Sequence, residues 1–272
     1  MATTATAKTA ERAVLFSEPA DLEAFSGPCD RIYFGHEFCQ RRFPGPGAAG
    51  RALDLAAGRN LPFTLVTPFV TDAGLARVRE LLDELASAGL PDGFEIVVND
   101  WGALRMIRHK WPGIPLILGR LLTKQKRGPR LMNILDRLPA DAADHFMRSN
   151  VDTPHLAEFL RTQGIVRVEL DNLLQGIRRA PGTLPASLYT PFAYISTTRL
   201  CLLMRGDQSD KNFRSIGQCS RECRRYDITL THPDMPVPLH LHGNTMFFKN
   251  NEIPSDLAEL NIDRIVFEPG VP

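Results

Sequence analysis

The sequence predicts an α/β protein with a TIM-type (β/α) barrel, irregular or incomplete in form. Apolar, β-branched runs alternate with segments of helical periodicity along most of the chain. A length of 272 residues fits one such barrel. A flat doubly wound sheet is the alternative, but no G-x-G-x-x-G turn follows any predicted strand. We therefore expect parallel strands joined by right-handed crossovers, in one domain over residues 1–272.

The first half of the chain contains strands rich in β-branched and aromatic residues, separated by amphipathic helices. One helix begins after Thr71-Asp72, shows Leu, Val and Leu at helical spacing, and ends near Gly89. A second helix follows Asp100, a typical capping residue. The predicted strands are Arg31–Phe38, Phe63–Val70, Phe94–Val98 and Ile114–Leu118, and the second helix is Asp100–Trp111.

In the second half, Asp152-Thr153-Pro154 marks a helix start, because a capping residue is followed by proline in the first turn. This helix is expected to end at Gly164. Further strands are predicted at Val166–Leu170, at Leu188–Ser196 with Pro191 interrupting it, and at Arg264–Phe267 after a short helix at Ser255–Leu260. Residues 227–250 predict an added β-hairpin that covers one rim of the barrel. We expect residues 1–12 to form a disordered N-terminal segment.

The charge balance gives no general attraction to nucleic acid or to anionic membranes. The chain has 32 Lys and Arg against 31 Asp and Glu, a formal net charge of +1. Two basic runs, Arg120–Arg130 and Arg221–Arg225, are interpreted as solvated faces. No apolar stretch reaches the roughly 20 residues of a membrane span, and the N-terminus lacks the apolar core of a secretory signal. We expect a cytoplasmic protein with reduced thiols and no nucleic-acid partner.

The placement of the cysteines is the most specific signal in the sequence. Cys219 and Cys223 form a C-x₃-C pair among Ser, Arg and Glu, whereas core cysteines usually have apolar neighbours. Nearby arginines favour the thiolate, which is the form that binds metal. Cys201 follows a predicted strand, and Cys39 ends the first predicted strand. Because strand ends converge on one face of a barrel, these four cysteines could meet.

Four thiolates suit either zinc or a 4Fe–4S cluster. Structural zinc sites typically contain two close cysteine pairs, and only one such pair is present here. One close pair with two distant single ligands is more typical of a cluster held across a fold. The spacing does not choose between these readings, and unrelated thiols are a third.

Other polar side chains fall at or near the carboxyl ends of predicted strands, where barrel enzymes place their sites. Taken singly, each is more often a helix cap or a rim ion pair. His240 and His242 share a face of the predicted hairpin, and we interpret them as ordinary exposed histidines. The strand-end candidates are His36, Glu37, Asn99, Asp100, Arg120, Glu169, Asp171 and Asn172.

The order of these motifs resembles the peptidase U32 family, and especially its UbiV-like branch. The matching features are the Tyr-Phe-Gly segment that ends in Cys39, the Y-x-S-x-x-R-x-C segment from Tyr194 to Cys201, and the C-x₃-C pair followed by basic residues. A terminal β-rich segment also matches. The interval between Cys201 and Cys219 is longer here, through an insertion at residues 206–215.

The resemblance implies a 4Fe–4S cluster on Cys39, Cys201, Cys219 and Cys223, with Cys29 outside the set. It also implies oxygen-independent hydroxylation of an aromatic or prenylated ubiquinone precursor, in a heterodimer with a UbiU-like sister protein. The alternatives are an RNA hydroxylation factor of the same family, a U32-type peptidase and a zinc-stabilised binding module. Proteolysis is the weaker reading, since His36 and Cys39 would point to opposite faces of one strand.

Overall fold

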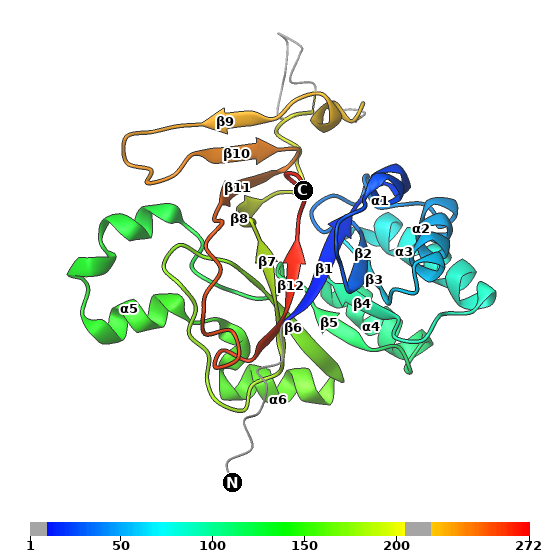
Figure 1. Ribbon diagram of the computed structural model, residues 1–272, viewed down its shortest axis with the longest axis horizontal. Helices are drawn as coiled ribbons and strands as arrows, with labels where there is room; N and C mark the ends of the chain where they lie inside the picture. The colour runs from blue at the N-terminus through cyan, green and yellow to red at the C-terminus, as the bar shows by residue number, and fades with distance from the viewer. Residues whose placement is uncertain (1–9, 205–218) are drawn as a thin grey trace.

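The computed structural model describes residues 10–204 and 219–272. Eight parallel strands close into a barrel in the order β1-β12-β7-β6-β5-β4-β3-β2 (Figure 1). This arrangement confirms the predicted TIM-type fold. The barrel strands are β1 Glu11–Phe16, β2 Arg31–Gly35, β3 Phe63–Val66, β4 Glu95–Val98, β5 Leu116–Leu118, β6 Ile165–Asp171, β7 Ala186–Thr190 and β12 Ile262–Phe267.

The first half of the barrel is regular, because one helix follows each of β1 to β4. The connection from β5 to β6 is longer and contains α5 and several 3₁₀ turns before α6, and residues 172–185 join β6 to β7 without a helix. The helices are α1 Pro19–Ala24, α2 Pro46–Gly58, α3 Asp72–Ala88, α4 Trp101–Lys110, α5 Ala140–Met147 and α6 Pro154–Thr162, with 3₁₀ turns η1 Pro129–Asn133, η2 Leu135–Arg137, η3 Asn150–Asp152 and η4 Glu222–Arg224. None of the helices that the structure describes is long and apolar enough to span a membrane.

A four-stranded antiparallel sheet replaces the helix expected after β7. Its strands are β8 Phe192–Thr197, β9 Ile228–Leu230, β10 Leu239–His242 and β11 Thr245–Lys249, in the order β8-β11-β10-β9. Pro191 separates β8 from β7, because proline has no N–H to donate to a ladder. Figure 1 shows this sheet above the end of the barrel to which β7 and β12 point. The sheet therefore covers the carboxyl ends of the barrel strands, and the predicted hairpin is part of it.

Three expectations from the sequence need correction. Strand β1 begins at Glu11, so the expected lead of residues 1–12 is too long, and residues 1–9 lie outside the described part. The short helix expected at Ser255–Leu260 is instead a series of turns. Strand β2 ends at Gly35, before His36 and Cys39. The insertion at residues 206–215 also lies outside the described residues.

Side chains fill the barrel, so it has no central channel. Seven strands each contribute one buried residue to a cluster inside the barrel, while a larger cluster packs between the strands and the surrounding helices. Any site for a ligand must therefore lie at an end of the barrel. The inner cluster consists of Ala13, Tyr33, Val66, Val97, Ile117, Tyr189 and Val266.

Candidate functional site

The four cysteines singled out in the sequence line one cavity of about 260 Å³. Cys39 comes from the loop between β2 and α2, Cys201 from the segment after β8, and Cys219 and Cys223 from the region of η4. Each is a free thiol and partly buried. The structure thus brings together residues from the two ends of the chain, as the sequence indicated. Their role as metal ligands remains a prediction.

Cys29 lies elsewhere. Its side chain packs against the hydrophobic cluster between strands and helices, just before β2 begins. Burial raises the pKa of its thiol. Cys29 therefore lies at the end of the barrel where β2 begins, whereas the other four cysteines lie at the end where β2 finishes.

The cysteine cavity is electropositive. Arg42, Arg199 and Arg221 line it together with apolar side chains such as Phe69 and Met204. Burial raises the pKa of the Cys201 and Cys223 thiols, while the guanidinium of Arg42 acts in the opposite direction on Cys223. Positive charge next to thiols favours the thiolate that a metal requires.

The turn between β10 and β11 holds the cysteine segments in place. The Nδ2 of Asn244 donates to the carbonyl of Phe38 at 2.7 Å and to that of Thr198 at 2.5 Å. The backbone N–H of Leu203 donates to the carbonyl of Gly243 at 3.3 Å. Asn244 therefore joins the Cys39 loop to the segment that leads to Cys201. The sequence analysis did not single out Asn244.

His242 and His240 are half-buried, so their interpretation as ordinary exposed histidines is wrong. The ring nitrogens of His242 lie 2.6 Å from the carbonyl oxygens of Cys223 and Pro272. The ring of His240 instead meets that of Phe192 edge-on. Of these two histidines, His242 lines the cysteine cavity and His240 does not.

His36 is positioned by its own loop and not by a strand. Its Nδ1 accepts hydrogen bonds from the backbone N–H groups of Phe38 and Cys39 at 3.2 and 3.1 Å. Burial lowers the pKa of His36 well below its ordinary value, so the ring is neutral and carries its proton on Nε2. Such a ring has no free lone pair to take a proton from Cys39. His36 and Cys39 lie in a loop, so they do not occupy opposite faces of one strand as expected, but the hydrogen bonds of His36 are an independent reason against Cys/His proteolysis.

Among residues 10–204 and 219–272, no three His, Cys, Asp or Glu side chains converge closely enough to hold one metal ion. A single ion requires all its ligands around one point. In a 4Fe–4S cluster the four thiolates bind four different irons and lie farther apart.

A buried charge network lies beneath this cavity, at the carboxyl ends of the strands. Arg120 is 0% exposed and contacts three carboxyl groups. Its Nη2 lies 2.6 Å from Glu37 Oε2 and also donates to Glu268, and its Nη1 lies 3.1 Å from Asp171. Arg127 pairs with the other oxygen of Asp171 at 2.8 Å. Glu37, Arg120 and Asp171 were strand-end candidates, whereas Glu268 and Arg127 were missed.

The network contains more carboxyl groups than cations. Burial, followed by the charge of Glu37, raises the pKa of Glu169 to about 8, although Tyr189 donates a hydrogen bond to it at 2.8 Å. Burial also raises the pKa of Glu37 and raises that of Glu268 well above its ordinary value. With a pKa of about 8, Glu169 holds its proton at neutral pH. The guanidinium of Arg120 lies over the ring of Tyr189, 3.9 Å from its centroid.

The remaining strand-end candidates have structural roles. Asp100 caps α4 by accepting from the N–H groups of Gly102 and Ala103. The Asn99 side chain bridges neighbouring strand ends, donating to the Thr67 carbonyl and accepting from the N–H of Leu121. Asn172 donates to the carbonyl of Glu252 at 2.7 Å.

The interpretation of Arg120–Arg130 as a solvated face is only partly right. Arg120 and Arg127 are buried in the charge network, while Lys124, Lys126 and Arg130 are exposed. Arg221, Arg224 and Arg225 are exposed, as expected for a solvated face. The first run therefore presents fewer cations to solvent than its sequence suggests.

Comparison of the sequence with known protein families gives no match, and comparison with characterised proteins gives none either. Comparison with solved structures gives several matches, and two of them are described here. The U32 peptidase Mk0906 is 14% identical, with a TM-score of 0.49, over 100% of this chain and 97% of that one. The immunomodulatory active chitinase TsES1 from Trichuris suis is 10% identical, with a TM-score of 0.38, over 95% of this chain and 91% of that one. At this similarity neither structure assigns an activity to this chain.

Proposed function

We propose that this chain is an iron–sulfur protein of the peptidase U32 family that holds a 4Fe–4S cluster on Cys39, Cys201, Cys219 and Cys223. The observation that carries the proposal is that these four free cysteines, from distant segments, line one cavity. Such convergence of polar-flanked thiols has no role in packing the core. It is what a cofactor held across the mouth of a barrel requires.

The volume of the cavity favours a cluster over zinc. About 260 Å³ is far more than the roughly 30 Å³ that one water molecule occupies in the liquid. A structural zinc ion needs no space beyond its four ligands. A cluster with four cysteine ligands supplies electron transfer when bound.

The motif resemblance to the UbiV-like branch extends the proposal to a reaction. The chain acts in the cytoplasm in oxygen-independent hydroxylation of an aromatic or prenylated ubiquinone precursor, paired with a UbiU-like partner. The alternative of an RNA hydroxylation factor loses support, because Arg120 and Arg127 face the interior and cannot contact phosphates. The peptidase alternative loses support from the neutral, hydrogen-bonded ring of His36.

The cluster is tested by anaerobic purification, with iron and acid-labile sulfide assays, absorption spectra and EPR after reduction. We expect about four irons and four sulfides per chain. Serine at any one of Cys39, Cys201, Cys219 or Cys223 should remove most of the iron. Cys29→Ser is the matched control and should keep it. One zinc per chain with no sulfide would contradict the cluster.

The hydroxylation is tested separately. The reconstituted protein and a UbiU-like sister protein are incubated anaerobically with a prenylated phenol, and hydroxylated product is sought by mass spectrometry. We expect product with the native chain and none with Cys223→Ser. A fully loaded pair that yields no product would refute the reaction and leave the cluster standing.

A further inference from the structure

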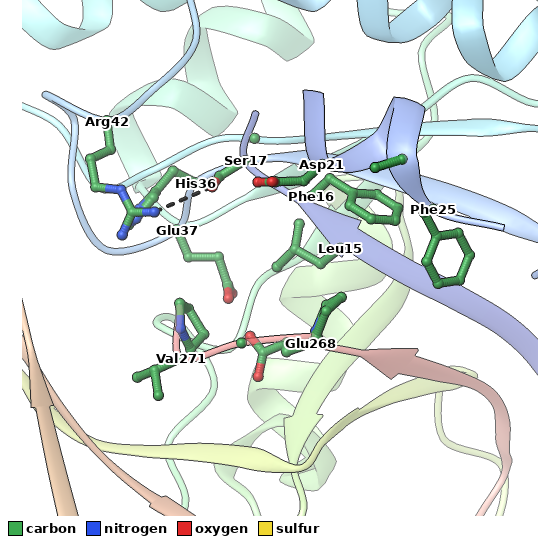
Figure 2. A pocket seen from close by; sticks show the side chains of 15 residues that line it. Leu15, Phe16, Ser17, Asp21, Phe25, His36, Glu37, Arg42, Glu268 and Val271 are labelled. Carbon is green, nitrogen blue, oxygen red and sulfur yellow. Dashed lines mark hydrogen bonds between the residues drawn. The ribbon is translucent and has the colours of Figure 1, made fainter. Parts of the chain in front are cut away.

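A second cavity, of about 490 Å³, lies between β1, α1 and the segment that follows β12. Figure 2 shows Arg42, Ser17 and Asp21 along one side, and Val271 and Glu268 on the other. Phe16 and Phe25 form an aromatic wall, with ring centroids 5.3 Å apart in an edge-to-face arrangement. The cavity thus combines an apolar body with polar ends, as small-molecule sites do.

Three buried polar atoms on residues that line this cavity have no hydrogen-bond partner within the described part of the chain. They are His36 Nε2, Arg42 Nε and Glu268 Oε2. His36 is 5% exposed and Glu268 is 2% exposed. Buried polar atoms in folded proteins are nearly always paired, so an unpaired group calls for an explanation. Three such groups around one cavity point to a ligand that pairs them.

The chemistry of these groups defines the ligand. His36 Nε2 carries the proton of a neutral ring and is a donor. The guanidinium of Arg42 donates to Ser17 Oγ at 3.2 Å and forms no ion pair with a carboxylate among the described residues. A free cation beside a neutral donor suits an anion, above all a carboxylate.

The opposite end of the cavity suits a neutral polar group. One oxygen of Glu268 faces Arg120, and the other, Oε2, is unpartnered. Burial raises the pKa of Glu268 well above its ordinary value, and its unpartnered Oε2 can accept a hydrogen bond from a hydroxyl group of a ligand. The exposed carboxylate of Asp21 also lines the cavity and disfavours a second negative charge there.

We propose that this cavity binds a compact organic monoacid with its carboxylate on Arg42 and His36, its apolar or aromatic body against Phe16 and Phe25, and a hydroxyl group at Glu268. The volume lies within the roughly 300–1,000 Å³ of known small-ligand sites. His36, Arg42 and Pro272 line both cavities, so the ligand would lie next to the cysteines. The site goes beyond the proposed function and does not depend on a bound metal.

The probe is 4-hydroxybenzoate, titrated into the full-length protein by isothermal calorimetry, both as purified and after iron reconstitution. We expect saturable binding in both samples. The neutral 4-hydroxybenzamide should bind at least about tenfold more weakly, because the charge-assisted bonds to Arg42 are lost. Terephthalate, which replaces the hydroxyl with a second carboxylate, should also bind more weakly.

Two substitutions test the cavity in different ways, one by removing its cation and the other by filling its rim. Arg42→Gln removes the cation, with Arg41→Gln as the matched control, since Arg41 is exposed and lines only the cysteine cavity. Ala24→Trp places bulk at the exposed end of α1, on the rim of this cavity and away from the cysteines. Arg42→Gln and Ala24→Trp should each weaken 4-hydroxybenzoate at least about tenfold, and Arg41→Gln should not.

The proposal is overturned if the native protein does not bind 4-hydroxybenzoate at millimolar concentration, or if binding survives Ala24→Trp unchanged. Circular dichroism of each variant checks its fold, and if Arg42→Gln misfolds then Ala24→Trp decides alone. Iron is assayed in the same samples. Native protein that binds 4-hydroxybenzoate but carries no iron after reconstitution would count against the cluster and leave this binding site standing.

Discussion

The Nε2 of His242 lies 2.6 Å from the carbonyl oxygen of Cys223, and its Nδ1 lies 2.6 Å from that of Pro272. One side chain of β10 therefore ties the η4 segment to the residues that follow β12. These contacts join three parts of the chain that border the cysteine cavity.

We expect His242→Ala to loosen the segment that carries Cys223. A hydrogen bond donated by this ring contributes about 1 kcal/mol, so local opening should become at least about fivefold more frequent. Trypsin should then cut faster after Arg224 and Arg225, and reconstituted protein should lose iron faster to a chelator. His240→Ala, on the same strand, is the control and should match the native protein. Equal cleavage rates for the two variants would contradict the role of His242.

Asn244→Asp should destabilise the protein, because a carboxylate cannot donate to the carbonyls of Phe38 and Thr198. Leaving a buried polar group unpaired costs about 1–3 kcal/mol. The midpoint of urea unfolding should fall accordingly. Asn251→Asp makes the same change at an exposed position and should shift stability by less than about 0.5 kcal/mol. Similar shifts in both variants would show that Asn244 does not join the two loops.

Arg120→Met should be among the most damaging single changes in the protein. It leaves Glu37, Asp171 and Glu268 buried without their shared cation, and breaking a buried ion network costs roughly 3–5 kcal/mol. Arg130→Met removes an exposed partner of Asp234 and should cost at most about 1 kcal/mol. Chemical unfolding of the two variants measures the difference. A near-neutral Arg120→Met would mean that the three carboxyl groups are all protonated.

The raised pKa of Glu169 predicts a specific dependence of the free energy of unfolding on pH. Burial, then Glu37, raises its pKa to about 8, above the value of 4.5 expected for the unfolded chain. The folded state therefore holds the extra proton, and this contribution to stability is complete below pH 4.5 and is lost as the pH rises through 8.

Glu169→Gln mimics the protonated side chain and still accepts from Tyr189. Across this window one titrating group changes the free energy of unfolding by up to about 1.4 kcal/mol per pH unit. The variant should lose less stability than the native protein between pH 5 and pH 8, as measured by urea unfolding at each pH. Parallel pH profiles would contradict the raised pKa.

Helices and strands could be predicted from the sequence where the hydrophobic periodicity and the capping residues indicated the same element. Helix α3 is an example, with Thr71 accepting from the N–H of Gly74 as its cap and Gly89 at its end. Helix α2 was missed, because its buried face consists of small residues, Ala49, Ala52 and Ala56, without a periodic run of large apolar ones. Strand β1 was missed because it is stabilised by two partners, β2 and β12, that are distant in sequence.

Only some residues of the candidate site could be predicted from the sequence. The polar neighbours of Cys219 and Cys223 indicated that they are not ordinary core residues. The position of Glu37, Arg120 and Asp171 at the carboxyl ends of predicted strands indicated that they belong to a site. The same logic could have found Glu268, which directly follows the last strand, but its Glu-Pro-Gly setting is typical of a turn. The complete burial of Arg120 could not be predicted, because it depends on carboxyl groups contributed by three other strands' ends.

The topology also fixes when the cysteine site can form during synthesis. Cys39 emerges early from the ribosome, whereas Cys219 and Cys223 come after β8 and the barrel closes only when β12 pairs with β1. Chains grow at roughly 5–20 residues per second, so about 9 to 36 seconds separate the synthesis of Cys39 from that of Cys219, which is 180 residues later. Any cofactor shared by the four must therefore be delivered after Cys223 has been synthesised, and a nascent chain halted before Cys219 would offer too few thiols to retain it.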